Sequence, residues 1–227
     1  MKKVLSSAFL LSLVTAAAYC GETPASSVRC DFDAARMLEE KCHFQWVFRV
    51  PHTKFVIVDE PTAVDRRVLA VEADKASGIM IFKFDGLDIK KTPYMHWRWR
   101  IVRRVNIPDG TAEPDDQACV IYLSDGNMLR QKCVGYRWEH FVPVGTRRMI
   151  KYPCSQVDAW CLRNRETPVG EWVEEERNVF EDFKQAFGEE PSENAAITIG
   201  ANSQYSKSDT RVEIDYIEFR SSPTTGR

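Results

Sequence analysis

The sequence predicts an all-β protein, an antiparallel β-sandwich with one or two short helices. Three observations lead to this prediction. Apolar and polar residues alternate along short runs, turn dipeptides separate several of these runs, and helical periodicity is confined to two segments. The turn dipeptides, which favour antiparallel neighbours, are Asp85-Gly86, Asp109-Gly110 and Asp125-Gly126.

Nine runs have the alternation that is typical of strands. Their lengths are those usual for strands in globular proteins, and many of their residues are β-branched or aromatic. The runs are 44–50, 54–58, 67–73, 78–84, 95–103, 117–124, 132–138, 195–201 and 211–220.

One helix is predicted directly after Asn178, which can cap its N-terminus. Apolar residues four apart at 179, 183 and 187 then form a single stripe that can pack on a sheet. Gly188 is placed to end the helix in the left-handed conformation, and Pro191 prevents it from resuming. A weaker helix is predicted at 34–41.

The first twenty residues have the three-part layout of a secretory signal peptide. Lys2 and Lys3 precede an apolar run at 4–18 that ends in small residues. This run is shorter than the roughly 20 residues that span a bilayer as a helix, so no transmembrane segment is expected. We expect a periplasmic or secreted protein. Its expected parts are a signal peptide at 1–20, a flexible leader at 21–29, a single β-sandwich domain at 30–220 and a flexible tail at 221–227.

The charge balance argues against a nucleic-acid partner. The chain has 31 basic and 33 acidic residues, and without the two lysines of the first twenty residues the balance is 29 against 33, a formal charge of −4. Nucleic-acid binders usually have a pI above about 9, whereas the pI here is about 6.1.

Seven cysteines are present, an awkward number in an oxidising compartment. Cleavage after Cys20 would leave six cysteines, whereas cleavage after Ala18 would leave Cys20 near a free N-terminus. Lipid attachment at Cys20 is disfavoured, because Tyr19 is bulkier than the small residue expected before a lipidated cysteine. We expect three disulfides, which pair Cys154 with Cys161, Cys30 with Cys42, and Cys119 with Cys133 across two strands.

The run at 95–103 carries the first candidate ligand site. Strict alternation places its tryptophans on one face, and His96, Arg98 and Arg100 on the other. In one interpretation the tryptophans are core and the arginines form an ion-paired outer face. In the other, these three polar side chains bind an anionic glycan, because guanidinium forks match carboxylates and sulfates.

A second candidate cluster surrounds the end of the run at 132–138. Tyr122 lies on the preceding run. The residues at the strand end itself are Tyr136, Arg137, Trp138, Glu139 and His140, followed by Arg147-Arg148. Aromatic rings stack on the apolar faces of sugars while charged groups bind hydroxyls, so this composition suits a sugar site. The alternative is an ordinary strand end whose aromatic residues are simply buried.

Asp115 and Asp116 form the third candidate site, at the entry to the run at 117–124. Adjacent carboxylates can bind Ca²⁺ through oxygen ligands, anchor a turn, or hydrogen-bond a ligand. Consecutive residues of an extended strand point to opposite faces, which disfavours a shared catalytic site. No other cofactor is expected.

Four separated motifs resemble, in order and approximate spacing, those of a bacterial family, the domain of unknown function 3047. The motifs are PYMHWRWRI at 93–101, Asp115-Asp116 followed by ACVIYL, EERNVFEDFKQAFGEEP at 175–191 and VEIDYIEF at 212–219. The resemblance covers roughly residues 67–220. It implies a secreted jelly-roll or galactose-binding-like sandwich, related in style to sugar-binding modules, and no assigned activity. The segment at 200–210 departs from the acidic pattern of that family.

Three classes of function remain at this point. The leading class is an envelope or secreted module that binds a glycan without catalysis. The expected compartment, the sandwich architecture and the aromatic content favour it. A polysaccharide lyase or glycoside hydrolase is the second class, although the sequence has no GxSxG, HExxH or Gly-rich phosphate motif. A lyase would need an arginine and a tyrosine–histidine pair on one face. The third class is a structural or assembly protein of the envelope.

Overall fold

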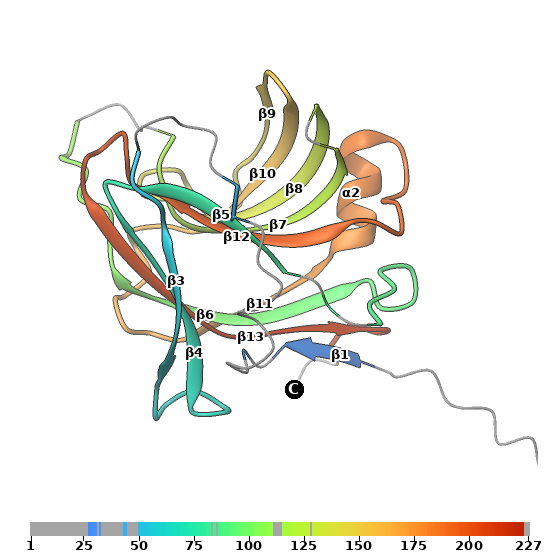
Figure 1. The fold of residues 1–227 in the computed structure, drawn as a ribbon, viewed down its shortest axis with the longest axis horizontal. Coiled ribbons are helices and arrows are strands. Elements are labelled where there is room, and N and C mark those ends of the chain that lie inside the picture. The colour runs from blue at the N-terminus through green and yellow to red at the C-terminus, as the bar shows by residue number, and fades with distance from the viewer. Residues whose placement is uncertain are drawn as a thin grey trace, which may run out of the picture.

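The computed structural model describes residues 27–30, 32, 43–44, 50–82, 84, 86–110, 115–127 and 129–224 (Figure 1). The predicted signal peptide at 1–20 and the weaker helix at 34–41 lie outside these residues. Two β-sheets face each other in the described part, which confirms the predicted β-sandwich. Among the described residues, no helix combines the length and apolar character needed to cross a membrane.

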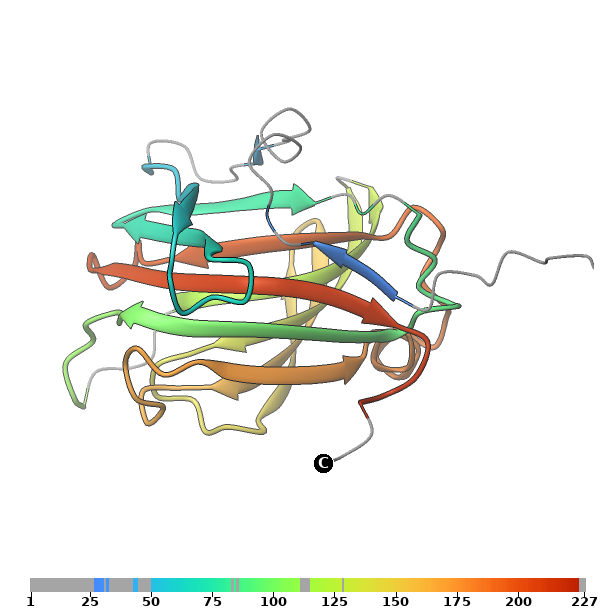
Figure 2. The ribbon, with the colours of Figure 1, turned by 90° about the horizontal axis from the view of Figure 1, so that it is seen from below.

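The first layer is a six-stranded sheet with β13 at its centre, seen face-on in Figure 2. Its neighbours pair in an antiparallel manner, and β1 lies beside the C-terminal part of β13. The order of strands is β11 (Val173–Asn178), β6 (Tyr94–Arg103), β13 (Asp209–Arg220), β4 (Arg67–Asp74) and β3 (Lys54–Asp59), with β1 (Ser27–Cys30) on β13.

The second layer is a seven-stranded sheet, in which β8 and β10 form a parallel pair and the other neighbours are antiparallel. Its strands β7 to β10 bend away from the six-stranded sheet (Figure 1). The order of strands is β2 (His43–Phe44), β5 (Ser77–Phe82), β12 (Ala196–Asn202), β7 (Gln117–Asn127), β8 (Arg130–Trp138), β10 (Ser155–Arg163) and β9 (Arg147–Tyr152).

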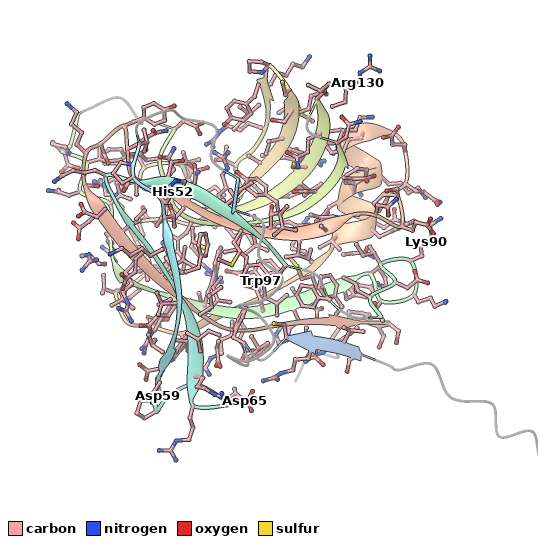
Figure 3. All side chains as sticks on the ribbon, in the orientation of Figure 1. His52, Asp59, Asp65, Lys90, Trp97 and Arg130 are labelled. Carbon is pink, nitrogen blue, oxygen red and sulfur yellow. The ribbon has the colours of Figure 1, made fainter. Side chains whose placement is uncertain are left out.

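An aromatic layer holds the two sheets together. Trp97 and Trp99 of β6 are fully buried, and their ring centroids lie 5.7 Å apart. Trp97 also packs on Tyr136 of β8 at 5.4 Å, and Trp99 packs on Trp138 at 5.3 Å. Figure 3 shows Trp97 between the sheets. The predicted alternation of β6, with its tryptophans facing the core, is therefore correct.

The predicted capped helix is present as α2 (Val179–Phe187). The Asn178 side chain accepts a hydrogen bond from the backbone N–H of Glu181, and Gly188 follows the helix with φ of 71°. Phe183 is fully buried in the core between the sheets. The helix lies against β8 at one end of the sandwich, as Figure 1 shows.

The predicted runs from residue 54 onward all coincide with strands, but the sequence interpretation missed β9, β10 and β11. The strand β11 has the acidic sequence VEEERN, which has little intrinsic strand preference, and it forms through pairing with β6. Residues 27–29, predicted as flexible leader, form β1 because β13 offers them a free edge. Both cases depend on a partner that is distant in sequence.

Two of the predicted disulfides are wrong. Cys154 immediately precedes β10 and Cys161 lies within it, so about 23 Å of extended chain separates them. Cys119 is opposite Trp138, and Cys133 is opposite Ser124, five positions along the same strand pair. A disulfide needs Cα atoms within about 7 Å. The third pair includes Cys42, which lies outside the described residues.

We predict that Cys119, Cys133 and Cys154 are thiols in the folded protein. Burial raises the pKa of the Cys133 thiol to about 11, so iodoacetamide at neutral pH should modify half-buried Cys154 well before Cys133. Peptide mapping after native and denaturing alkylation measures this order. A peptide that joins Cys119 to Cys133 without reduction would contradict the strand register.

We also predict that Trp97→Ala lowers the free energy of unfolding by about 3 to 5 kcal/mol, because it leaves a cavity in the aromatic layer. Urea denaturation followed by circular dichroism measures the change. Leu129→Ala is the control, since Leu129 is 76% exposed and its loss should change stability by less than about 0.5 kcal/mol. Equal effects of the two substitutions would contradict the prediction.

Candidate functional site

The outer face of the six-stranded sheet carries the first predicted site, and its arginines are bound to carboxylates of the same chain. Arg98 Nη1 lies 2.7 Å from Asp215 Oδ2. Arg100 Nη2 lies 2.6 Å from Glu213 Oε2 and also contacts Glu60. Burial raises the pKa of Asp215 even though Arg98 and a backbone amide stabilise its charged form.

Trp172, from the segment before β11, covers these two arginines. The guanidinium carbons of Arg98 and Arg100 lie 4.7 Å and 4.4 Å from its ring centroid. Its indole N–H donates a hydrogen bond of 2.9 Å to the hydroxyl of Thr62. The geometry thus supports the ion-paired interpretation of this face and leaves the arginines poorly placed to bind an anion.

His96 lies on the same outer face and is 8% exposed. Its Nε2 is 3.6 Å from Glu174 Oε2, and its ring packs on Tyr216 at 5.4 Å. Burial lowers the pKa of His96, although the neighbouring carboxylates oppose this shift. His96 therefore lies between β11 and β13 as a packed neutral ring.

Tyr136 and His140 lie away from the outer face that carries Arg98 and Arg100. Tyr136 points into the core, where its hydroxyl donates a hydrogen bond of 2.7 Å to Asp182. His140 follows β8, and its ring packs edge-on against Phe141 at 4.4 Å. The arginine and the tyrosine–histidine pair that a lyase would need are thus distributed over the core, both sheets and a loop.

Tyr122 and Arg137 do come together, on the outer face of the seven-stranded sheet. Arg137 Nη2 donates to the Tyr122 hydroxyl at 3.5 Å. Cross-strand register places Tyr122 in line with Gly135, Ala159 and Arg148, so all four positions share this face. Figure 1 shows that the bend of β7 to β10 puts this face on the inside of the curve.

A contact between Tyr152 and Asp115 shows how strongly this face curves. Tyr152 ends β9, whereas Asp115 lies two residues before β7. Three strand steps separate β7 from β9, about 14 Å in a flat sheet. The Tyr152 hydroxyl nevertheless donates a hydrogen bond to the Asp115 carboxylate. The residues before β7 and the end of β9 therefore approach each other over the strands β8 and β10.

Arg137 lies beneath this bridge and is 1% exposed. Its Nη1 is 3.0 Å from Asp115 Oδ1 and 3.7 Å from Glu139 Oε1. Glu139 in turn accepts a hydrogen bond of 2.7 Å from Arg148 Nη2. We call these residues the Arg137 cluster. Its members are Asp115, Tyr122, Arg137, Glu139, Arg148 and Tyr152.

The pKa values of Tyr122, Tyr152 and Arg137 are all raised above their ordinary values. Burial raises the pKa of Tyr122, and burial together with the hydrogen bond to Asp115 raises that of Tyr152. Burial alone would lower the pKa of Arg137, but Tyr122, Glu139 and Asp115 raise it. Both tyrosines are therefore neutral and Arg137 is charged at physiological pH. The Nε–H of Arg137 is buried and has no acceptor within the described part of the chain.

Glycine at position 135 allows the Tyr122 ring to lie close against the backbone of β8. A Cβ atom at Gly135 would be 2.6 Å from Cε1 and 2.7 Å from Cδ1 of Tyr122. Val157 of β10 borders the same spot and is buried on the same outer face, in a cluster that Tyr122 packs against. The small residue thus sets the position of the tyrosine ring beside Arg137.

The two aspartates of the third predicted site have separate partners. Asp116 is buried and accepts hydrogen bonds from the backbone amides of Tyr205 and Ser206, so it anchors the segment between β12 and β13. Asp115 belongs to the Arg137 cluster instead. Within the described ranges, no three His, Cys, Asp or Glu side chains are grouped so as to hold a metal ion. The Ca²⁺ hypothesis gains no support from this geometry.

Sequence reasoning named Glu139 in the mixed cluster at the end of the run at 132–138, but it did not count Arg148 or Tyr152 as members of a site. Glu139 directly follows β8, and continued alternation puts it on the same face as Arg137. Arg148 and Tyr152 lie on β9, which was not predicted as a strand. Their approach to Asp115 also requires the curvature of the sheet, which no local pattern specifies.

Comparisons with known proteins give a family and distant structural similarities. The model of a family described as "Protein of unknown function (DUF3047)" matches residues 43–218. The search of curated proteins gave no significant match.

Two solved structures from Clostridium thermocellum have a similar outline. One is a family 11 carbohydrate-binding module in complex with a β-1,3-1,4-mixed-linked tetrasaccharide, with a TM-score of 0.46 and 11% identity over 86% of this chain and 95% of the module. The other is the family 11 module of the cellulosomal cellulase Lic26A-Cel5E, with a TM-score of 0.39 and 9% identity over 82% and 89%. Both similarities are too weak to indicate what this chain binds.

We predict that Gly135→Ala displaces the Tyr122 ring and lowers the free energy of unfolding by about 1 to 3 kcal/mol, because the added methyl group overlaps the ring. A double-mutant cycle with Tyr122→Ala, measured by urea denaturation, identifies the cause. The cost of Gly135→Ala should largely vanish once the ring is removed. Additive effects would show that the methyl group strains something other than Tyr122.

Proposed function

The chain belongs to the DUF3047 family, and we propose that it is a carbohydrate-binding module whose site is the Arg137 cluster on the curved outer face of the seven-stranded sheet. The observation that carries the proposal is the convergence of two tyrosine rings with paired charged groups on the inside of that curve. The signal-peptide interpretation of residues 1–20 supports a module that works outside the cytoplasm, in the periplasm or the medium.

The tyrosines supply the apolar part of a sugar site. The Tyr122 ring lies close against the strand backbone at Gly135, and Tyr152 is 38% exposed at the rim. Rings held in this way offer flat surfaces to the C–H faces of a pyranose, and they lose little conformational entropy on binding. The ring also packs against Val157 and Ala159 of β10, and this packing keeps it from turning away.

The charged members supply hydrogen bonds of both kinds. Guanidinium groups only donate and carboxylates only accept, whereas a sugar hydroxyl does both. Asp115 and Arg148 are partly exposed, with side chains 41% and 33% accessible, so hydroxyls can reach them. The Nε–H of Arg137, which has no acceptor within the described part of the chain, is a further donor, and it is buried in the state in which Tyr152 binds Asp115.

A structural role is the second candidate, and one observation favours it. Arg137 binds Tyr122, Asp115 and Glu139, and Glu139 in turn binds Arg148 of β9, so the cluster also acts as a clamp that holds the curve. A clamp alone would explain the ion pairs. It would not require the tyrosine ring to lie on the surface above Gly135.

Glycan arrays followed by calorimetric titration test the proposal. We expect Tyr122→Ala to weaken binding at least tenfold, about 1.4 kcal/mol, because it removes the stacking surface. Tyr94→Ala is the matched control, since Tyr94 lies on the outer face of the opposite sheet and its loss should leave affinity unchanged.

Unfolding measurements on both variants accompany the titrations, so that a loss of binding is not confused with a loss of structure. If the folded protein binds no glycan, or if Tyr122→Ala and Tyr94→Ala weaken binding equally, the Arg137 cluster is not the site and the structural role is favoured.

A further inference from the structure

We infer that the ligand of the Arg137 cluster is an electrically neutral glycan, and that its arginines act as hydrogen-bond donors to hydroxyls and not as counter-ions for an acidic sugar. This inference rests on the proposed function and adds the charge class of the ligand. It replaces the expectation of an anionic glycan, which came from the arginines of β6.

The charges of the cluster cancel. Arg137 is paired with Asp115 and Glu139, and Glu139 is paired with Arg148. Two positive and two negative side chains therefore give no net charge. The whole chain has a formal charge of −2, so long-range attraction does not favour an acidic polymer either.

An anionic ligand would have to displace a carboxylate from Arg137. The displaced group, Asp115 or Glu139, would then face the ligand as a like charge. Glu139 is 4% exposed and could not regain solvent without unfolding its surroundings. Leaving one buried charge without its partner is strongly destabilising, so the exchange is unfavourable.

A neutral hydroxyl meets no such obstacle. It can donate to Asp115 and accept from Arg137 or Arg148 while the existing ion pairs remain in place. The Tyr152 hydroxyl already occupies one such position, because it donates to Asp115 as a sugar hydroxyl would. A hydroxyl of the ligand can therefore take the place of the Tyr152 hydroxyl with equal numbers of hydrogen bonds made and broken.

The opposite face leads to the same conclusion. Arg98 and Arg100, the basis of the anionic expectation, are bound to Asp215 and Glu213, whose side chains are 0% and 4% exposed. These carboxylates also cannot move away to make room for an acidic ligand.

The test uses matched pairs of oligosaccharides, each a neutral oligomer such as cellohexaose and its C6-oxidised, carboxylate-bearing counterpart. Titrations of the full mature protein are run at low and at high salt, where the screening length falls from about 30 Å near 0.01 M to about 3 Å near 1 M. We expect binding to the neutral member of a pair, at least tenfold tighter than to the oxidised member, and a change of less than twofold with salt.

Asp115→Asn provides a second measurement. The substitution keeps an oxygen acceptor for Tyr152 but gives the cluster one net positive charge, so the ratio of oxidised to neutral affinity should rise severalfold and become salt-dependent. Tighter binding of the oxidised member by the wild-type protein would overturn the inference and leave the proposed function intact. Binding of neither member by the folded protein, across glucan, mannan, xylan and galactan pairs, would overturn both.

Discussion

The burial of tryptophan between the sheets is the constraint on which the rest of the structure depends. Side chains of a strand alternate between its faces, so fixing Trp97 and Trp138 inside the sandwich also fixes which neighbours lie outside. A shift of one residue in β8 would put Arg137 in the core and Trp138 in water. The composition of both outer faces thus follows from the packing of the core.

The two outer faces show that equal residue types can have different surroundings. Arg98 lies under Trp172 against a fully buried aspartate, whereas Arg137 lies among tyrosines with partners at the rim. Both arginines were predicted as ligand groups, since alternation identifies the outward side chains of a strand. Alternation does not say what covers them, and that depends on segments far away in the chain.

The strands and helix that sequence patterns specify locally could be predicted, including the cap at Asn178 and the aromatic face of β6. The cluster was predicted in part, through Tyr122, Arg137, Glu139 and Asp115. Arg148 and Tyr152 depend on the curvature of the sheet and on β9, an edge strand rich in basic residues. Curvature is a property of seven strands together, and so it has no signature in any one of them.

The bridge between Tyr152 and Asp115 has a kinetic consequence. The strand β9 has a single neighbour in its sheet, and edge strands with few partners open at low free energy. When its end opens, Tyr152 leaves Asp115 and Arg137 meets solvent. For the proposed glycan site, we therefore expect association to be limited by this motion of the protein, with a rate that stops increasing at high ligand concentration. The fluctuations of one peripheral strand would then set how fast the proposed site is occupied.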